Sequence, residues 1–147
     1  MGSEVTLINS ANPEQAYSVL KKAYECSIYP IGPQWKLKHL RDYCRKDSVL
    51  SVYYKHQPVG FVCFLKIDSL TIEILLLAIL PQYWRQGLMK QAVLQLLQRY
   101  DEVWLEVHEQ NIPAKQLYLS LGFEITGRRL NYYGNDGTAL MMRYKKS

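Results

Sequence analysis

Hydrophobic residues along the first half of the chain alternate between helix and strand spacing. Residues 5–9 are β-rich and predict a short strand. Asn12 and Pro13 then supply an N-cap and a helix-starting proline. The helix that they begin is expected to bury four apolar residues: Ala16, Val19, Leu20 and Ala23. A second helix is expected after Pro33, with one face formed by Leu37, Leu40 and Cys44.

Three β-rich runs follow and predict the centre of a sheet at residues 48–54, 59–67 and 71–80. The first two are separated by residues 55–58, a pattern typical of a hairpin turn. Apart from Glu73, the third run is apolar on both faces from residue 72 onward. That pattern indicates a strand that is covered on both sides.

The second half begins with a helical stripe after Pro81, made of Leu88, Met89, Ala92, Val93, Leu96 and Leu97. A strand is expected at residues 103–108, followed by a short helix that Asn111 caps and Gly122 closes. Its inward residues are Ala114, Leu117, Tyr118 and Leu121. Two final strands, 123–130 and 138–144, are joined by a turn at 134–137. The sequence therefore predicts an α/β or α+β fold, with a mixed sheet flanked by helices.

Composition narrows the picture to one domain over residues 1–147, because 48% hydrophobic and 21% charged residues are ordinary globular values. The net charge of +5 would suit an anionic ligand, a nucleic acid or an acidic membrane surface. No dense basic run with interleaved aromatics is present, so we do not expect DNA binding. The longest apolar run, 74–80, is too short to span a membrane.

Three cysteines, Cys26, Cys44 and Cys63, form an odd number without metal-ligand spacing. They predict reduced, buried thiols and a cytoplasmic protein. No cluster of histidine, cysteine and carboxylate has the spacing of a metal site, so none is expected.

The segment from Glu73 to Leu97 is the most informative for chemistry. A strand that passes through a glycine turn into a helix N-terminus offers free backbone N–H groups and a positive dipole end to a phosphate. Gly87 lets the backbone approach such a ligand, while Arg85 and Lys90 add positive charge. Taken alone, the segment fits an ordinary structural turn equally well.

Two motifs at the right separation carry a family resemblance. Residues 73–88, EILLLAILPQYWRQGL, resemble the acetyl-coenzyme A segment of GNAT N-acetyltransferases. A second set of residues resembles the second GNAT motif: Leu105-Glu106-Val107, Asn111, Ala114, Leu117-Tyr118 and Leu121-Gly122-Phe123. With Asn131-Tyr132-Tyr133, the chain is most similar to the bacterial ribosomal-protein alanine N-acetyltransferase branch. The resemblance covers residues 59–144.

The resemblance implies the GNAT acyl-CoA N-acyltransferase fold: a mixed, mostly antiparallel sheet of about six to seven strands flanked by about four helices. It implies acetyl-CoA as co-substrate, without a metal. Implied contacts to acetyl-CoA are Leu77, Ala78, Ile79, Arg85, Gln86, Gly87, Leu88, Met89, Lys90, Asn111, Ala114 and Tyr118. A backbone N–H within residues 77–79 would hold the oxyanion. The family's phosphate loop keeps a polar residue where this chain has Trp84 and a small one where it has Met89, so a lost polar contact and added bulk are expected.

Acetyl transfer to an amine needs a proton acceptor and a proton for the leaving thiolate. The resemblance makes Glu106 the base, with Glu73 as the rival, and Tyr118 the acid. Each has a structural alternative: a strand-edge carboxylate paired with a surface cation, and a core tyrosine. Asn111 also fits simple helix capping. His108 is expected at a solvated strand end and receives no role.

The acceptor implied by the branch is a protein N-terminal α-amine. Two alternatives remain open at this point: a small-molecule amine acetyltransferase, and a non-catalytic GNAT-fold module that binds a partner or senses coenzyme A. The expected partners are acetyl-CoA and the amine acceptor, in a monomer or homodimer.

Overall fold

The computed structural model describes residues 4–9, 11–28, 35–130 and 137–147. Within these ranges it contains one seven-stranded sheet in the order β1-β2-β3-β4-β5-β7-β6. Neighbouring strands are antiparallel except for the parallel pair β4 and β5. The strands are β1 (Val5–Ile8), β2 (Val49–Tyr54), β3 (Gln57–Asp68), β4 (Thr71–Ile79), β5 (Glu102–His108), β6 (Glu124–Arg129) and β7 (Ala139–Lys145). The mixed, mostly antiparallel sheet expected for the GNAT fold is confirmed.

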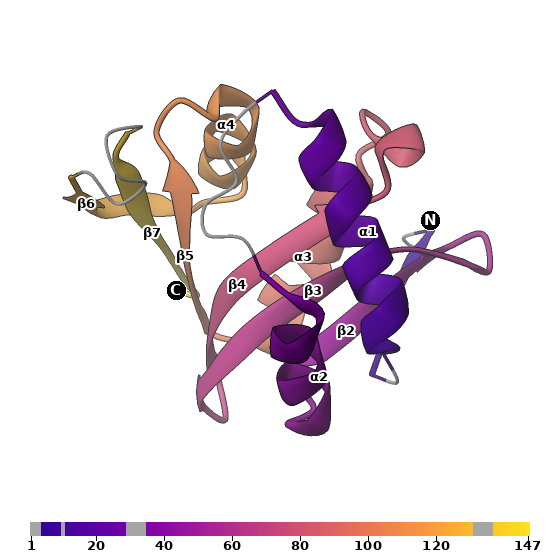
Figure 1. Cartoon of the computed structure of the whole chain (residues 1–147). Helices are drawn as coiled ribbons and strands as arrows, with labels where there is room; N and C mark the ends of the chain where they lie inside the picture. The colour runs from indigo at the N-terminus through magenta and orange to yellow at the C-terminus, as the bar shows by residue number, and fades with distance from the viewer. Residues whose placement is uncertain (1–3, 10, 29–34, 131–136) are drawn as a thin grey trace.

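Helices cover both faces of the sheet (Figure 1). The described helices are α1 (Pro13–Cys26), α2 (Leu37–Arg45), the short 3-10 helix η1 (Pro81–Tyr83), α3 (Leu88–Arg99) and α4 (Ile112–Ser120). One core lies under α1 and α2, and a larger core lies under α3 and α4. All four apolar residues expected inside the first helix are buried. The sheet therefore separates an α1/α2 face from an α3/α4 face.

Local signals begin and end the helices where the sequence predicts. The Asn12 side chain accepts the Gln15 N–H at 3.0 Å and caps α1. Gly122 has φ 97°, and the N–H of Phe123 bonds to the carbonyl of Tyr118, which closes α4 in a Schellman motif. The turn expected at residues 134–137 and the Asn131-Tyr132-Tyr133 segment lie outside the described residues, except for Gly137.

Two expectations about the first half of the chain need correction. The turn between β2 and β3 is two residues long, Lys55 and His56, because Tyr54 already pairs with Gln57. Both turn residues have positive φ, 50° and 64°, as a type I′ hairpin requires. The thiols are not all buried: Cys63 is buried, Cys44 is half-buried and Cys26 is exposed, because Cys26 ends α1 outside its apolar stripe.

A β-bulge in β4 determines which side chains face which helices. Cys63 pairs with Leu76, but Phe64 pairs with Ile74, so Leu75 is the extra residue. Ile74 consequently belongs to the α3/α4 core, whereas Leu76 belongs to the α1/α2 core. The strand is thus covered on both faces, as its apolar run predicts.

Gly60 of β3 is required where this strand pairs with the end of β4, opposite Ile79. A Cβ at this position would lie 2.3 Å from the Ala78 carbonyl oxygen and 2.6 Å from the Ile79 Cδ1. We expect Gly60→Ala to lower the free energy of unfolding by about 2 kcal/mol, because the ladder must shift to admit the methyl group. Chemical denaturation measures this loss. Gly127→Ala is the control, because its Cβ would meet only the Met141 sulfur at 3.6 Å, and equal stability of the two variants would contradict the prediction.

Candidate active site

The N-terminus of α3 is an exposed, uncapped turn. Gly87 has φ 76° and Arg85 has φ 64°, and no side chain caps the helix. The Gln91 N–H bonds to the Gly87 carbonyl, so the N–H groups of residues 88–90 precede the helical hydrogen bonds. Successive free N–H groups in such left-handed turns form a concave anion site, and the helix dipole adds positive potential. This part of the chain can hold a phosphate.

Both departures from the family's phosphate loop have a structural explanation. The Trp84 indole nitrogen donates a hydrogen bond to the Ile79 carbonyl at 2.7 Å, whereas the loss of a polar contact to the cofactor at this position stays a prediction. Met89 is half-buried and packs against the α3/α4 core. Part of its bulk is thus taken up by the core, and its effect on the bound cofactor stays a prediction.

Gly87→Ala is expected to weaken the affinity for acetyl-CoA about tenfold. The left-handed backbone costs an alanine about 1–2 kcal/mol, and no atom lies within 4 Å of the added Cβ, which would occupy the space open to a phosphate. Calorimetric titration with acetyl-CoA measures the affinity, and thermal unfolding reports any loss of fold. Unchanged affinity in a folded variant would show that the phosphates bind elsewhere.

The two parallel strands stop pairing halfway along their length. The β4–β5 ladder runs from Thr71 and Glu102 to Ile74 and Leu105 and ends there. Beyond that point β4 continues to pair only with β3, and β5 only with β7. Figure 1 shows the two strands diverging toward their C-terminal ends.

This divergence leaves backbone groups of β4 outside the ladder. Leu80 N–H bonds to the Val59 carbonyl at 2.8 Å. The alternation of an antiparallel ladder then turns the N–H groups of Leu77 and Ile79 away from β3, toward the diverging β5. The Ile79 carbonyl confirms this direction, because it accepts the Trp84 hydrogen bond from outside the sheet. The expected oxyanion donors within residues 77–79 are thus Leu77 and Ile79, while Ala78 faces the α1/α2 core.

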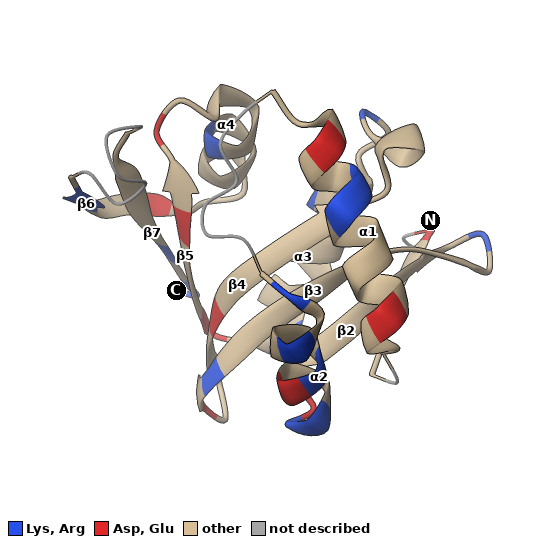
Figure 2. Cartoon of the chain, in the orientation of Figure 1, with Lys and Arg blue, Asp and Glu red and all other residues tan. Residues whose placement is uncertain are grey.

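Glu73 and Glu106 lie on the same face of the sheet. Glu73 pairs in register with Trp104, and Glu106 follows two residues later on β5. The intervening Leu105 belongs to the opposite, α3/α4 core. Both carboxylates therefore project from the α1/α2 face, where Figure 2 shows acidic positions on β4 and β5.

The two carboxylates differ in their surroundings. Glu106 is 18% exposed, and its Oε1 lies 3.2 Å from the Nε of Arg129 on β6. Burial raises the pKa of Glu73, the nearby Glu106 raises it further, and Arg129 lowers it. Glu106 stands directly beyond the last β4–β5 pair, whereas Glu73 is within the paired stretch. Glu106 is thus the carboxylate at the divergence.

Tyr118 lies on the other side of the sheet. It is 8% exposed within the α3/α4 core, and its ring meets Phe123 edge-on at 5.4 Å. Burial raises the pKa of Tyr118 to about 12. Among the described residues nothing hydrogen-bonds to its hydroxyl, yet none of their fully buried side-chain oxygens or nitrogens lacks a partner. The hydroxyl oxygen therefore keeps contact with solvent, although the ring is a core residue.

Asn111 caps α4, since its side chain accepts the Ala114 N–H at 3.3 Å, and Ala114 packs against the core.

His108 is buried at 2% exposure, so the expectation of a solvated strand end is wrong. Its Nδ1 accepts the Gln110 N–H at 3.0 Å. A Cβ on Gly137 would lie 2.4 Å from its Nε2, so the chain after the 131–136 segment packs directly on the ring.

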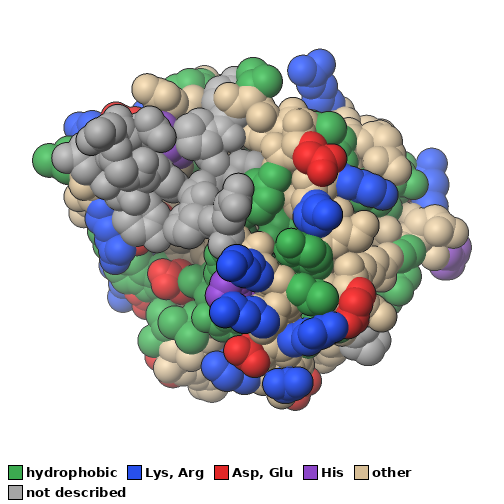
Figure 3. Space-filling view, viewed as in Figure 1, with side chains coloured by type: hydrophobic (Ala, Val, Ile, Leu, Met, Phe, Trp, Pro, Cys, Tyr) green, Lys and Arg blue, Asp and Glu red, His purple; other side chains and the backbone are tan. Residues whose placement is uncertain are grey.

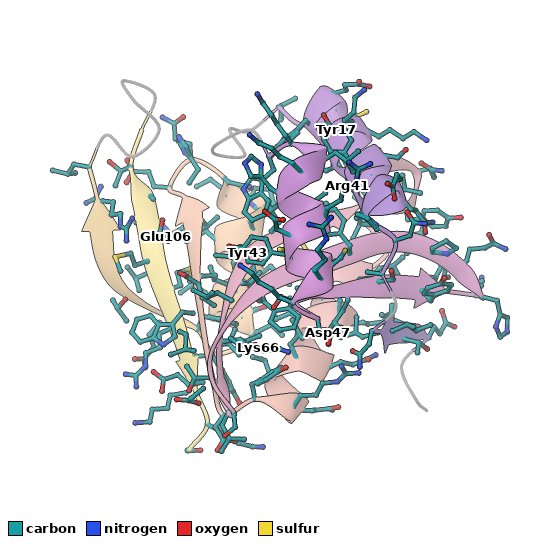
Figure 4. The ribbon with its side chains drawn as sticks, turned by 60° about the horizontal axis from the view of Figure 1, so that its bottom comes forward. Tyr17, Arg41, Tyr43, Asp47, Lys66 and Glu106 are labelled. Atoms are coloured by element: carbon teal, nitrogen blue, oxygen red, sulfur yellow. The ribbon has the colours of Figure 1, made fainter. Side chains whose placement is uncertain are left out.

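Two residues near the carboxylates were not identified from the sequence. Tyr43 of α2 is half-buried against the α1/α2 core, and burial, then Cys63 and Glu73, raise its pKa. In Figure 4, Tyr43 lies between the rest of α2 and the half of the sheet that carries Glu106. Arg129 reaches Glu106 from β6, two strands away in the sheet. Only the helical stripe of α2 could have indicated Tyr43, and the sequence gives no signal for Arg129.

The helix beside the carboxylates is strongly basic. Residues 36–47 contain five exposed cations, Lys36, Lys38, Arg41, Arg45 and Lys46, against Asp42 and Asp47. Figure 3 shows Lys and Arg side chains gathered over the region of α2. Lys46 Nζ lies 5.4 Å from the centre of the Tyr43 ring. The α1/α2 face thus combines a pair of carboxylates with a rim of positive charge.

A sheet whose one parallel pair diverges beside an uncapped helix N-terminus defines the class of acyl-coenzyme A N-acyltransferases. The sequence agrees, because the model of the Acetyltransferase (GNAT) family matches residues 14–123. The chain belongs to this family and is an acetyl-CoA-dependent acetyltransferase. No curated protein matches the sequence.

Solved structures share the fold over almost the whole chain. Ard1 from Thermoplasma volcanium is 26% identical, with a TM-score of 0.76 over 99% of each chain. The ribosomal-protein-S18-alanine N-acetyltransferase of Escherichia coli is 24% identical, with a TM-score of 0.80 over 97% of this chain and 93% of that one. A GNAT family acetyltransferase from Elizabethkingia anophelis with acetyl-CoA bound is 16% identical, with a TM-score of 0.72 over 98% and 99%.

Among the described residues, no three histidine, cysteine or acidic side chains are placed to hold a metal ion. None of the described helices has the length and apolarity needed to span a membrane.

Proposed function

We propose that this enzyme acetylates protein N-terminal α-amines in the cytoplasm, with acetyl passing directly from acetyl-CoA to the amine. The observation that carries the chemistry is that Glu106, directly beyond the last β4–β5 pair, and Tyr118, in the α3/α4 core, lie on opposite faces of the sheet. An amine on the α1/α2 face would meet the Glu106 carboxylate, which can accept its proton. A thiolate leaving on the α3/α4 face would meet the Tyr118 phenol, which can donate a proton. The similarity to the ribosomal-protein-S18-alanine N-acetyltransferase supports the α-amine as acceptor.

The cofactor would lie on the α3/α4 face. Its phosphates would meet the N–H groups of residues 88–90, with Arg85, Gln86 and Lys90 at the exposed rim. The N–H groups of Leu77 and Ile79 would hold the thioester and its developing oxyanion. Asn111 and Ala114 would contribute the α4 side of this surface.

The reaction would need no covalent enzyme intermediate. An α-amine with a pKa near 8 is mostly protonated at neutral pH, so Glu106 accepts its proton, directly or through a water. The free nitrogen attacks the thioester carbon, the C–N bond forms and the C–S bond breaks. Tyr118 donates its proton to the departing thiolate, the nitrogen gives up its second proton to water as the amide forms, and the Tyr118 phenolate is reprotonated from solvent. Glu73 adds negative charge that attracts the incoming ammonium.

The charge around this site favours an α-amine over a polyamine. A polycation would be repelled by the cationic α2 rim, in particular by Lys46 beside Tyr43. A peptide N-terminus brings a single charge to the carboxylates and can place acidic or neutral residues against α2.

A panel of acceptors at equal concentration tests the proposal. Thiol release from acetyl-CoA is measured with peptides that have free N-termini, with the same peptides blocked at the N-terminus, and with lysine and spermidine. We expect kcat/KM to be at least tenfold higher for the free peptides, and mass spectrometry should place the acetyl group on the α-nitrogen. Preference for spermidine would establish the small-molecule alternative, and binding of acetyl-CoA without turnover of any amine would indicate a non-catalytic module.

A further inference from the structure

Arg129 lies beside the carboxylate pair of Glu73 and Glu106, although no step of the proposed reaction uses it. It lies at the end of the edge strand β6 and is 53% exposed, yet its Nε is directed at Glu106, which is only 18% exposed. The neighbouring Arg128 instead pairs with Glu109. Two adjacent arginines of β6 therefore form ion pairs with two different carboxylates. Only Glu106, the partner of Arg129, lies at the divergence of β4 and β5.

Two carboxylates on one face repel each other and each favours protonation of the other. The described residues give the Glu73 side chain neither a hydrogen bond nor an ion pair. The charged or titratable groups around the pair are Arg129 from β6, Tyr43 from α2 and His108 on β5, while Arg143 of β7 is paired with Glu102. Arg129 is thus the one guanidinium among the described residues that acts on the pair.

We propose that Arg129 is a positioning residue for the acceptor: it holds the Glu106 carboxylate in place and leaves the pair one excess negative charge, matched to a singly charged ammonium. An ion pair fixes the carboxylate orientation that a base needs. One guanidinium against two carboxylates also limits the attraction for dications. The inference rests on the proposed function, because it assumes that Glu106 receives the proton of the acceptor.

Removal of Arg129 should alter the pH dependence of the reaction. Arg129 lowers the pKa of Glu73, so without this cation protonation of the Glu73 carboxylate becomes more favourable and the acidic limb of kcat/KM should move to higher pH. At neutral pH, Arg129→Gln should lower kcat/KM for a free N-terminal peptide about tenfold, because the Glu106 carboxylate is no longer held in one orientation. The ratio of kcat/KM for spermidine to that for the peptide should rise, because the excess negative charge doubles.

The experiment compares the wild type with Arg129→Gln, Arg129→Lys and Arg128→Gln. The lysine variant keeps the charge and should retain the position of the acidic limb, while Arg128→Gln should match the wild type within about twofold. Thermal unfolding and acetyl-CoA affinity should not differ, because Arg129 is exposed and lies away from α3.

A pH profile of Arg129→Gln identical to that of Arg128→Gln would overturn the inference while the wild type still acetylates peptides. Failure of the wild type to acetylate any α-amine would instead refute the proposed function. An equal shift in both arginine variants would show a general effect of surface charge and would also overturn the inference.

Discussion

Glu106→Gln is expected to lower kcat for peptide acetylation by about 10²–10⁴. The amide keeps the shape of the side chain but cannot accept the proton of an α-ammonium. The affinity for acetyl-CoA should remain within about twofold, because Glu106 projects from the α1/α2 face, away from the N-terminus of α3. Stopped-flow or steady-state thiol release measures kcat, and calorimetry measures the affinity.

The matched control for this substitution is Glu109→Gln. Glu109 is also paired with an arginine of β6, but it lies past the end of β5. It should retain wild-type turnover within about twofold. If Glu73→Gln abolishes turnover while Glu106→Gln does not, then Glu73 is the base and the position of Glu106 at the divergence has been misread.

Tyr118→Phe is expected to lower kcat by about 10²–10³ without loss of fold. The variant retains the ring that packs on Phe123 and removes only the solvent-contacting hydroxyl. Tyr144→Phe is the control, because the Tyr144 ring also packs on Phe123, with 5.8 Å between centroids. Equal turnover in the two variants would assign Tyr118 to the core alone.

The same variant carries a pH signature. The folded-state pKa of Tyr118 is raised above its ordinary value of 10 to about 12. Ionisation is therefore easier in the unfolded chain, and the wild type should lose stability as the pH rises from about 10 toward 12. Tyr118→Phe should lose less over this window in denaturation experiments.

Much of the fold could be predicted because its signals are local. Asn12 and Gly122 act through hydrogen bonds within one turn, and the buried stripes of α1 and α3 follow from helical spacing alone. The length of the β2–β3 turn was missed, because Lys55 and His56 are not the residues that usually adopt positive φ.

The geometry of the candidate active site could not be predicted from the spacing of residues along the sequence. The bulge at Leu75 depends on the pairing with β3, and it decides which β4 residues face each core. The contact of Trp84 with the Ile79 carbonyl and the packing of Gly137 on His108 are tertiary. Glu106 and Tyr118 were identified by resemblance, but their placement on opposite faces follows only from the three-dimensional structure.

The most direct test of the account is a crystal structure with coenzyme A joined through an acetyl group to the α-nitrogen of a peptide. We predict the pyrophosphate at the N-terminus of α3, the coenzyme A sulfur near the Tyr118 hydroxyl, and the α-nitrogen on the α1/α2 face beside Glu106. A peptide that lies on the α3/α4 face, with neither carboxylate near its α-nitrogen, would contradict transfer across the divergence of β4 and β5.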